Sequence, residues 1–263
     1  MSSGFPKALL LIGAGKMGGA LMRSWLAAGM PKKAITVVDT ASTIKGAFRS
    51  LDDMRKTPDC IVLAVKPQTF DALLPEVKKK FGDGPLYISI AAGKPVVYFQ
   101  KALGSKTAIV RAMPNTPALI SKGISALYAN KQVNSKQKKI AATLLEAAGK
   151  IVWLNKETYI DAVTAISGSG PAYVFLFLES LITAGKAQGL PQAIARTLAI
   201  ETLIGSAKLA KLSKEPLTKL RANVTSKGGT TEAALSLLMN DDSFQSLISK
   251  AVDAAVKRAK DLA

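Results

Sequence analysis

Two glycine-rich segments, one near each end of the chain, hold the residue types that most clearly suggest chemistry. The first reads Gly13-Ala14-Gly15-Lys16-Met17-Gly18 and lies between an apolar run at residues 8–12 and a helical pattern. Its glycines permit a tight turn and a close backbone approach, and the following helix offers N-terminal amides to a pyrophosphate. A second apolar run, residues 34–38, ends at Asp39, where an acidic residue commonly binds the adenosine ribose hydroxyls. Together these features predict a dinucleotide-binding site.

The second segment reads Asn223-Val224-Thr225-Ser226-Lys227-Gly228-Gly229-Thr230-Thr231-Glu232. Its two glycines free the backbone to curl, Thr230 or Thr231 can cap the helix that follows, and the amides of the first helical turn can receive a carboxylate. A capped helix after a loop would explain the same residues without any ligand. The residues alone leave both interpretations open.

The amino-acid composition limits the kinds of site that the chain can form. The chain has 263 residues, of which 48% are hydrophobic and 21% charged, as expected for a soluble globular protein. It contains no His and one Cys, so we expect neither a metal site nor an internal disulfide, and the commonest general acid of dehydrogenases is missing. Cys60 begins the apolar run 60–65 and is interpreted as a buried strand residue.

Charge and hydropathy bear on the partners of the protein. The net charge of +18, from 36 basic and 18 acidic residues, is compatible with a polyanion partner such as nucleic acid. The lysines are scattered, and neither aromatic interleaving nor a nucleic-acid motif accompanies them, so we expect no nucleic-acid partner. The first residues lack signal-peptide character, and the longest later apolar run, residues 172–178, is too short to span a bilayer. The sequence predicts a cytoplasmic protein with no membrane partner.

Strand and helix patterns alternate over the first part of the chain, which predicts an α/β fold with an N-terminal Rossmann doubly wound parallel sheet. Strands are expected at residues 8–12, 34–38, 60–65, 85–90, 107–113, 123–129 and 149–154. After the glycine turn, helices are expected at residues 69–81, 96–103 and 135–148. The carboxyl ends of parallel strands line one crevice, so the loops 65–67, 91–93 and 113–117 should gather around the coenzyme.

Strand-like composition ends near Asn155, so we predict a dinucleotide-binding domain over residues 1–155 and a helical dimerisation and substrate domain over 156–263. Its helices are expected at residues 159–167, 171–188, 191–212, 231–239 and 243–262, with a short turn near residues 217–223. Ser169 or Gly170 should cap the helix that begins at Pro171, although such small residues also admit a ligand. That helix is apolar on nearly every face along residues 172–178, which predicts a homodimer; an internal core helix is the alternative.

Four motifs together closely resemble the pyrroline-5-carboxylate reductase family, and the resemblance extends from the first strand to the last helix. The motifs are Ala64-Val65-Lys66-Pro67, Arg111-Ala112-Met113-Pro114-Asn115-Thr116-Pro117, Ser167-Gly168-Ser169-Gly170-Pro171-Ala172-Tyr173 and Thr225-Ser226-Lys227-Gly228-Gly229-Thr230-Thr231. The resemblance implies that NADPH or NADH reduces pyrroline-5-carboxylate, a small molecule, to L-proline in the last step of proline biosynthesis. It also implies a Rossmann domain followed by an interleaved helical dimer domain, often in rings of dimers.

The resemblance also implies roles for individual residues. Those expected to bind the coenzyme are Gly13, Ala14, Gly15, Lys16, Met17, Gly18, Asp39, Thr40, Ala64, Val65, Lys66, Pro67, Ile90, Ala91, Ala92 and Asn223. Those expected to bind the substrate are Glu157, Ser226, Thr230 and Thr231, and the Thr231 hydroxyl is expected to reach the ring nitrogen as the catalytic group. The family's active site joins the coenzyme domain of one chain to helical segments of its dimer partner.

The implied chemistry suits a chain without His. A cyclic imine is basic enough to exist partly as the iminium, so hydride transfer needs mainly orientation and electrostatic placement. A hydroxyacid dehydrogenase, the alternative enzyme, would have to use a lysine such as Lys66 as its acid. A protein that binds the coenzyme without turnover is the non-enzymatic alternative.

One departure from the family concerns the coenzyme. The segment between Asp39 and Cys60 is shorter than usual by about a helical turn or more, so the wall on the adenosine side is expected to be reduced. Asp39 would repel a 2'-phosphate and favour NADH, whereas Thr40, Ser42 and Lys45 could hold one and favour NADPH. We expect both coenzymes to be used.

Overall fold

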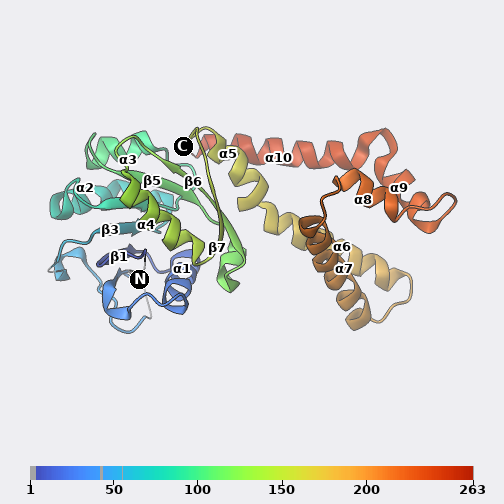
Figure 1. The fold of residues 1–263 in the computed structure, drawn as a ribbon, viewed down its shortest axis with the longest axis horizontal. Coiled ribbons are helices and arrows are strands. Elements are labelled where there is room, and N and C mark those ends of the chain that lie inside the picture. Colours follow the sequence, from blue (N-terminus) through green and yellow to red (C-terminus); the bar gives the residue numbers. More distant parts are fainter. Residues whose placement is uncertain (1–3, 42–43, 55, 263) are drawn as a thin grey trace. The chain divides into compact units, whose positions relative to one another are not determined.

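The computed structural model describes residues 4–41, 44–54 and 56–262, so Ser42 lies outside the described residues. The chain divides into two compact units, Met1–Pro171 with Ala255–Ala263, and Ala172–Ala254 (Figure 1). The first unit contains the sheet, and the second is helical. These units are defined by contacts within the chain. The predicted boundary between the dinucleotide-binding domain and the dimerisation and substrate domain, between residues 155 and 156, stays a prediction.

In the part of the chain that the structure describes, seven strands form one sheet in the order β2-β1-β3-β4-β5-β6-β7. They are β1 (Leu9–Ile12), β2 (Ile35–Val38), β3 (Cys60–Leu63), β4 (Leu86–Ser89), β5 (Ile109–Met113), β6 (Gly123–Ala129) and β7 (Gly149–Trp153). The predicted parallel sheet is confirmed for β1 to β5, whereas β6 pairs antiparallel with β5 and parallel with β7. The direction reverses because the connection from β5 to β6 contains only a 3₁₀ turn, Thr116–Ile120, which is too short for a parallel crossover.

Helices cover both faces of this sheet: α1 (Lys16–Ala27), α2 (Phe70–Phe81), α3 (Val96–Leu103) and α4 (Ser135–Glu146). Alternate residues of β1 point to opposite faces, so Leu9 and Leu11 pack in one core and Leu10 and Ile12 in the other. A strand that is buried on both faces therefore appears in the sequence as a continuous apolar run.

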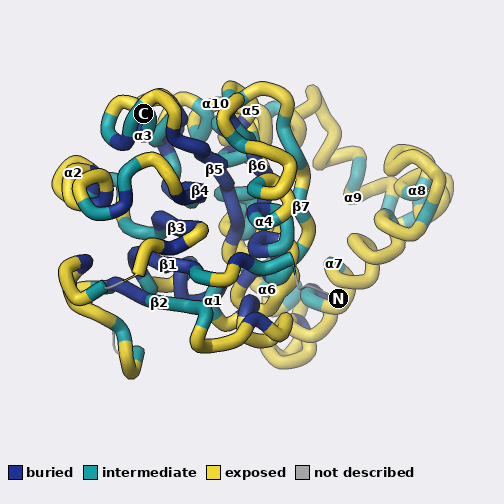
Figure 2. The backbone as a smooth tube through the Cα atoms, turned by 60° about the vertical axis from the view of Figure 1, so that its left-hand side comes forward, coloured by how far each residue is buried: buried dark blue, intermediate teal, exposed yellow. Residues whose placement is uncertain are grey.

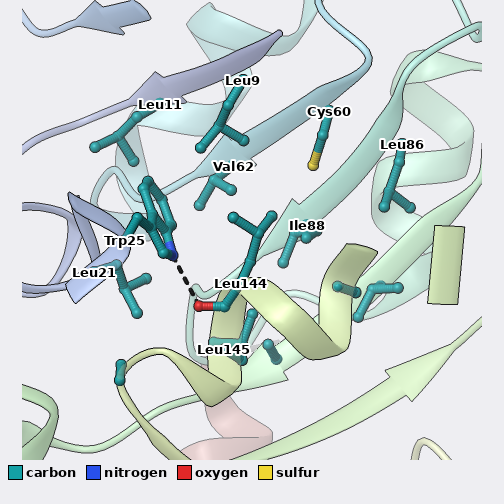
Figure 3. Packing of buried hydrophobic residues seen from close by; sticks show 14 of the residues in the cluster. Leu9, Leu11, Leu21, Trp25, Cys60, Val62, Leu86, Ile88, Leu144 and Leu145 are labelled. Atoms are coloured by element: carbon teal, nitrogen blue, oxygen red, sulfur yellow. Dashed lines mark hydrogen bonds between the residues drawn. The ribbon is translucent and has the colours of Figure 1, made fainter. Parts of the chain in front are cut away.

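The first core joins α1 to α4 by a specific contact. Trp25 is fully buried, and its Nε1 donates a hydrogen bond to the carbonyl oxygen of Leu144 at 2.8 Å (Figure 3). Cys60 lies in the same core, and burial raises the pKa of its thiol. The interpretation of Cys60 as a buried strand residue is confirmed.

The remaining helices follow the predicted order, and the segment 217–223, expected to be a short turn, is a helix as well. They are α5 (Tyr159–Val163), α6 (Gly170–Ala187), α7 (Gln192–Leu212), α8 (Leu217–Asn223), α9 (Thr230–Met239) and α10 (Ser243–Asp261). The predicted helix cap at Ser169 or Gly170 is wrong, because a π-helical turn, Thr164–Gly168, continues α5 toward α6. The Ser169 amide donates to the carbonyl of Thr164 at 2.8 Å, and this wider turn accommodates the extra residue without ending the helix.

Because the cap is missing, residues Tyr159–Ala187 form one apolar helix of 29 residues with a mean hydropathy of 1.3. Among the described residues it is the one helix that is long and apolar enough to cross a membrane. The sequence prediction that the longest apolar run is too short to span a bilayer refers to residues 172–178, which are only part of this helix. Length and composition are weak evidence for a membrane span, since interface and core helices meet the same test.

Candidate functional site

The first glycine segment forms the tight turn that the sequence predicts. Gly13 has φ of +90°, and a Cβ built on it would lie 2.7 Å from the carbonyl oxygen of Ala64. A Cβ on Gly18 would collide with the carbonyl oxygen of Gly13, whereas Gly15 faces open space. Gly15 is the N-cap of α1, and no described side chain caps this helix end. The turn therefore leaves the first amides of α1 free to meet an anion.

Asp39 follows β2 and binds the glycine turn directly. Its Oδ2 accepts a hydrogen bond from the Ala14 amide at 2.5 Å, and its Oδ1 accepts one from the Ala41 amide at 2.8 Å. The Asp39 carboxylate thus holds the backbone of the glycine turn and of the loop that follows β2. Its predicted contact with an adenosine ribose stays a prediction.

Sequence reasoning missed Arg49, which the short segment after β2 brings beside Thr40. Phe48 forms a bridge with Val38, and the Arg49 Nη1 donates to the Thr40 carbonyl at 2.7 Å. Lys45, which the sequence singled out, is exposed. No periodic pattern marks this segment, so only its content of basic residues could have pointed to Arg49.

The loops after β3 and β4 meet beside the glycine turn. The Ala64 amide donates to the Ile12 carbonyl at 2.8 Å, and the Ile90 amide donates to the Leu63 carbonyl at 3.2 Å. The structure therefore gathers the predicted coenzyme residues of three neighbouring strands at one edge of the sheet. Lys66 is exposed, and Pro67 begins a 3₁₀ turn.

Glu157 and Arg111 form a pair that sequence reasoning did not anticipate. The Arg111 side chain is only 5% exposed, and its Nη1 lies 3.1 Å from Oε1 of Glu157. Its Nη2 lies 3.7 Å from Oδ1 of Asp161. The same Oε1 of Glu157 accepts a hydrogen bond from the Val96 amide at 2.7 Å. No local signal could have revealed these contacts, because Glu157 lies 46 residues from Arg111 and 61 from Val96.

The second glycine segment forms a closed loop before α9. Gly228 has φ of +71°, and its amide donates to Oε2 of Glu232 at 2.6 Å. The Gly229 amide donates to the Ser226 carbonyl at 3.0 Å. The side chain of Asn223, a predicted coenzyme residue, donates through Nδ2 to Oε2 of Glu215 at 3.0 Å.

The predicted cap of α9 by Thr230 or Thr231 is wrong. Gly229 is the N-cap, no described side chain caps the helix, and both threonines lie in its first turn. The reason is that the loop closes through Ser226 and Glu232, which leaves the two hydroxyls without a capping role. The first turn of α9 therefore keeps amides that can receive a carboxylate, beside the hydroxyls of Thr230 and Thr231.

Two hollows lie in the helical unit. One of about 450 Å³ lies between α8 and α9, and its polar lining includes Arg221, Thr225 and Glu232. Another of about 530 Å³ lies between α6 and α7 and is mostly apolar. No predicted site residue lines either hollow.

Comparisons with known proteins match both parts of the chain. A family model described as pyrroline-5-carboxylate reductase dimerisation matches residues 157–262, and one described as NADP oxidoreductase coenzyme F420-dependent matches residues 8–93. A pyrroline-5-carboxylate reductase from Pseudomonas aeruginosa is 39% identical over 97% of this chain and 96% of its own.

Solved structures agree with these matches. The pyrroline-5-carboxylate reductase of Coxiella burnetii superimposes with a TM-score of 0.89 at 34% identity, and the match covers 98% of both chains. The pyrroline carboxylate reductase of Plasmodium falciparum, solved with NADP bound, gives a TM-score of 0.87 at 33% identity over 97% of both chains. Fold, length and sequence therefore agree on one group of enzymes.

Proposed function

The chain belongs to the pyrroline-5-carboxylate reductase family, and on this premise we propose how its own residues divide the work of the reaction. The protein is an NAD(P)H-dependent oxidoreductase that reduces pyrroline-5-carboxylate to L-proline, the last step of proline biosynthesis. The observation that carries this conclusion is the similarity to curated relatives over 97% of the chain.

We propose that the residues of the first unit hold NADPH or NADH. They fit such a group, because Gly15 faces open space at the uncapped start of α1 while Gly13 and Gly18 are packed too closely to carry a side chain. Asp39, Thr40 and the missed Arg49 lie at the end of β2, where the adenosine ribose is expected. Bound NAD(P)H supplies the hydride, and the loops that contain Ala64–Pro67 and Ile90–Ala92 line its nicotinamide half.

The loop before α9 is the proposed substrate site. The amides of the first turn of α9 and the side chains of Ser226 and Thr230 receive the substrate carboxylate, and the Thr231 hydroxyl binds the ring nitrogen. The hydride adds to the imine carbon of the iminium, whose nitrogen already carries its proton, and the product is the secondary amine. The site therefore needs to orient two molecules and stabilise charge, and it needs no strong acid.

The protein forms a homo-oligomer through its dimerisation domain. We propose that the basic assembly is a homodimer, which also builds rings of dimers, and that the loop before α9 of one copy serves the coenzyme of its partner. The family match and the exposed apolar surface of α6 support this arrangement. The same surface gives the long apolar helix a role without a membrane, so we propose a cytoplasmic enzyme that binds neither membrane nor nucleic acid.

A coupled assay of the purified protein tests the function directly. Pyrroline-5-carboxylate should drive oxidation of NADPH and NADH with formation of L-proline. Coenzyme binding without any turnover would instead support the non-enzymatic alternative.

Mixed dimers test the shared site. Gly15→Trp blocks the coenzyme site, and Thr231→Ala removes the catalytic hydroxyl. When subunits of the two variants are mixed, activity should recover, because a hybrid dimer has one site that contains neither change. A mixture no more active than the sum of its parts would place both groups in the same copy.

A further inference from the structure

The β4–α3 loop, residues 90–95, is held by hydrogen bonds at its start and at its end. At its start, the Ala91 amide donates to Oγ of Ser89 at 3.3 Å, and Ser89 pairs in register with Arg111 of β5. At its end, the Val96 amide donates to Oε1 of Glu157. Arg111 lies at the centre of this arrangement, because it also pairs with Glu157.

Glu157 replaces a cap that the sequence of α3 lacks. Pro95 is the N-cap of α3 and has no side chain that could accept a hydrogen bond, and the first turn of this helix contains no acidic residue. The carboxylate of Glu157 supplies the acceptor and a negative charge at the helix N-terminus, both of which stabilise it. The position of the first turn of α3 therefore depends on a residue from the start of the helical half.

Arg111 fixes Glu157 in turn. Its guanidinium is buried, its Nε has no hydrogen-bond partner among the described residues, and its Nη1 and Nη2 face the carboxylates of Glu157 and Asp161. A buried guanidinium without its carboxylates would be strongly destabilised, which makes the arrangement specific. Asp161, at 3.7 Å, is the weaker partner and touches no part of the β4–α3 loop in the contacts described.

Leu262, near the C-terminus, packs against the β4–α3 loop at Gly93. Gly93 is buried with φ of +78°, and a Cβ built on it would lie 2.6 Å from the carbonyl oxygen of Leu262. Leu262 follows α10, and the residues Ala255–Ala263 belong to the first unit. Any side chain at position 93 would therefore strain the backbone and displace the loop from Leu262.

We propose that Arg111 and Glu157 are positioning residues for hydride transfer, which act by holding the β4–α3 loop against the nicotinamide half of the coenzyme. Gly93 and Leu262 complete the support of the loop. This inference rests on the proposed function, in which Ile90, Ala91 and Ala92 line that half. It gives Glu157 a role different from the substrate contact that the family resemblance implies.

A pair of ligands separates positioning from general damage. ADP-ribose contains the adenosine and pyrophosphate parts of the coenzyme but no nicotinamide, so its affinity should not depend on the loop. In Glu157→Ala, the dissociation constant of NAD⁺ should rise about tenfold, as for loss of a charge-assisted hydrogen bond, while that of ADP-ribose stays within about twofold. Glu157→Gln keeps an oxygen for the Val96 amide and should fall between Glu157→Ala and the unmodified protein.

Two further variants complete the test. Asp161→Asn removes the weaker contact of Arg111 and leaves the hydrogen bond between Glu157 and Val96, so both affinities should change by about twofold at most. Gly93→Ala disturbs the loop without touching either charge and should reproduce the selective loss of NAD⁺ affinity.

Three results would overturn the inference: equal loss of affinity for both ligands in Glu157→Ala, no loss for either, or a raised KM for the imine substrate alone. Failure of the proposed function gives a different result, because the unmodified protein would then bind NAD⁺ without reducing the imine. The binding comparison would still report on the loop in that case.

Discussion

The two units of this chain satisfy their apolar residues in different ways. In the first unit, all residues of β1, β3, β4 and β5 are buried between two layers of helices. In the second unit every residue is described, yet only Ala195 and Ala199 are buried, and its helices are exposed almost throughout (Figure 2). The comparison teaches that the first unit buries its apolar residues by itself, whereas the second leaves them exposed in the single chain, as the proposed homodimer requires.

A charge introduced on α6 is the strongest test of this difference between the two units. Leu176 is 63% exposed in the single chain. Leu176→Glu would place a carboxylate in the proposed subunit interface at a cost of about 3 kcal/mol or more, so the dimer dissociation constant should rise at least a hundredfold. Sedimentation at several protein concentrations measures this change, and turnover should fall together with the dimer fraction.

Leu26→Glu is the matched control, because Leu26 is an exposed leucine on α1 of the first unit, with 37% exposure. It should leave the sedimentation coefficient unchanged. A Leu176→Glu protein that stays dimeric and fully active would show that α6 is not covered by a second copy.

The first unit is tested by removing one hydrogen bond from its core. Trp25→Phe leaves the buried carbonyl of Leu144 without its donor and shortens a fully buried side chain. We expect a loss of about 2–3 kcal/mol in the free energy of unfolding, measured in urea, with a midpoint independent of protein concentration. Trp153→Phe serves as the control, because Trp153 is only partly buried and its ring lies 4.6 Å from the Lys138 ammonium, a contact worth about 1 kcal/mol or less. Equal losses in the two variants would contradict the role given to the Trp25 hydrogen bond.

The catalytic prediction concerns the loop before α9, which belongs to the second unit. Thr231→Ala should lower kcat about tenfold to a hundredfold, as expected for one positioned polar contact, and leave the free energy of unfolding nearly unchanged because Thr231 caps no helix. Thr231→Ser keeps the hydroxyl and should retain most of the activity. A steady-state rate for Thr231→Ala equal to that of the unmodified protein would remove Thr231 from the mechanism.

The adenosine side of the first unit gives a smaller effect. Arg49 lies at the carbonyl of Thr40, next to Asp39, so its charge favours a 2'-phosphate that the carboxylate repels. Arg49→Ala should lower the ratio of kcat/KM for NADPH to that for NADH about fivefold to tenfold, and Asp39→Ser should raise the ratio. Lys45→Ala is the control, with a change of about twofold at most. A ratio unaffected by Arg49→Ala would exclude Arg49 from coenzyme selection.

The sequence predicted most elements because each strand and helix carries a local signal. Buried strands such as β3 are continuous apolar runs, and α3 has the predicted bounds, 96–103. The direction of β6 depends on the short connection before it, and the π turn depends on how Thr164 and Ser169 bond; neither leaves a periodic pattern. Likewise, the glycine turns could be predicted as ligand sites, whereas the contacts of Glu157 could not, because they join positions dozens of residues apart.

The smallest expected effect is a dependence of stability on alkaline pH that arises in the first unit. Burial and the hydrogen bond to Asp71, at 2.6 Å, raise the pKa of Tyr98 to about 12 from its ordinary value of 10. The folded state therefore holds this proton more tightly than the unfolded state, so the contribution to stability is complete below pH 10 and is lost as the pH rises toward 12. The Lys94 ammonium lies 4.8 Å from the centre of the Tyr98 ring. The difference in urea midpoint between the unmodified protein and Tyr98→Phe should shrink between pH 10 and 12, whereas a constant difference would show that Tyr98 titrates alike in both states.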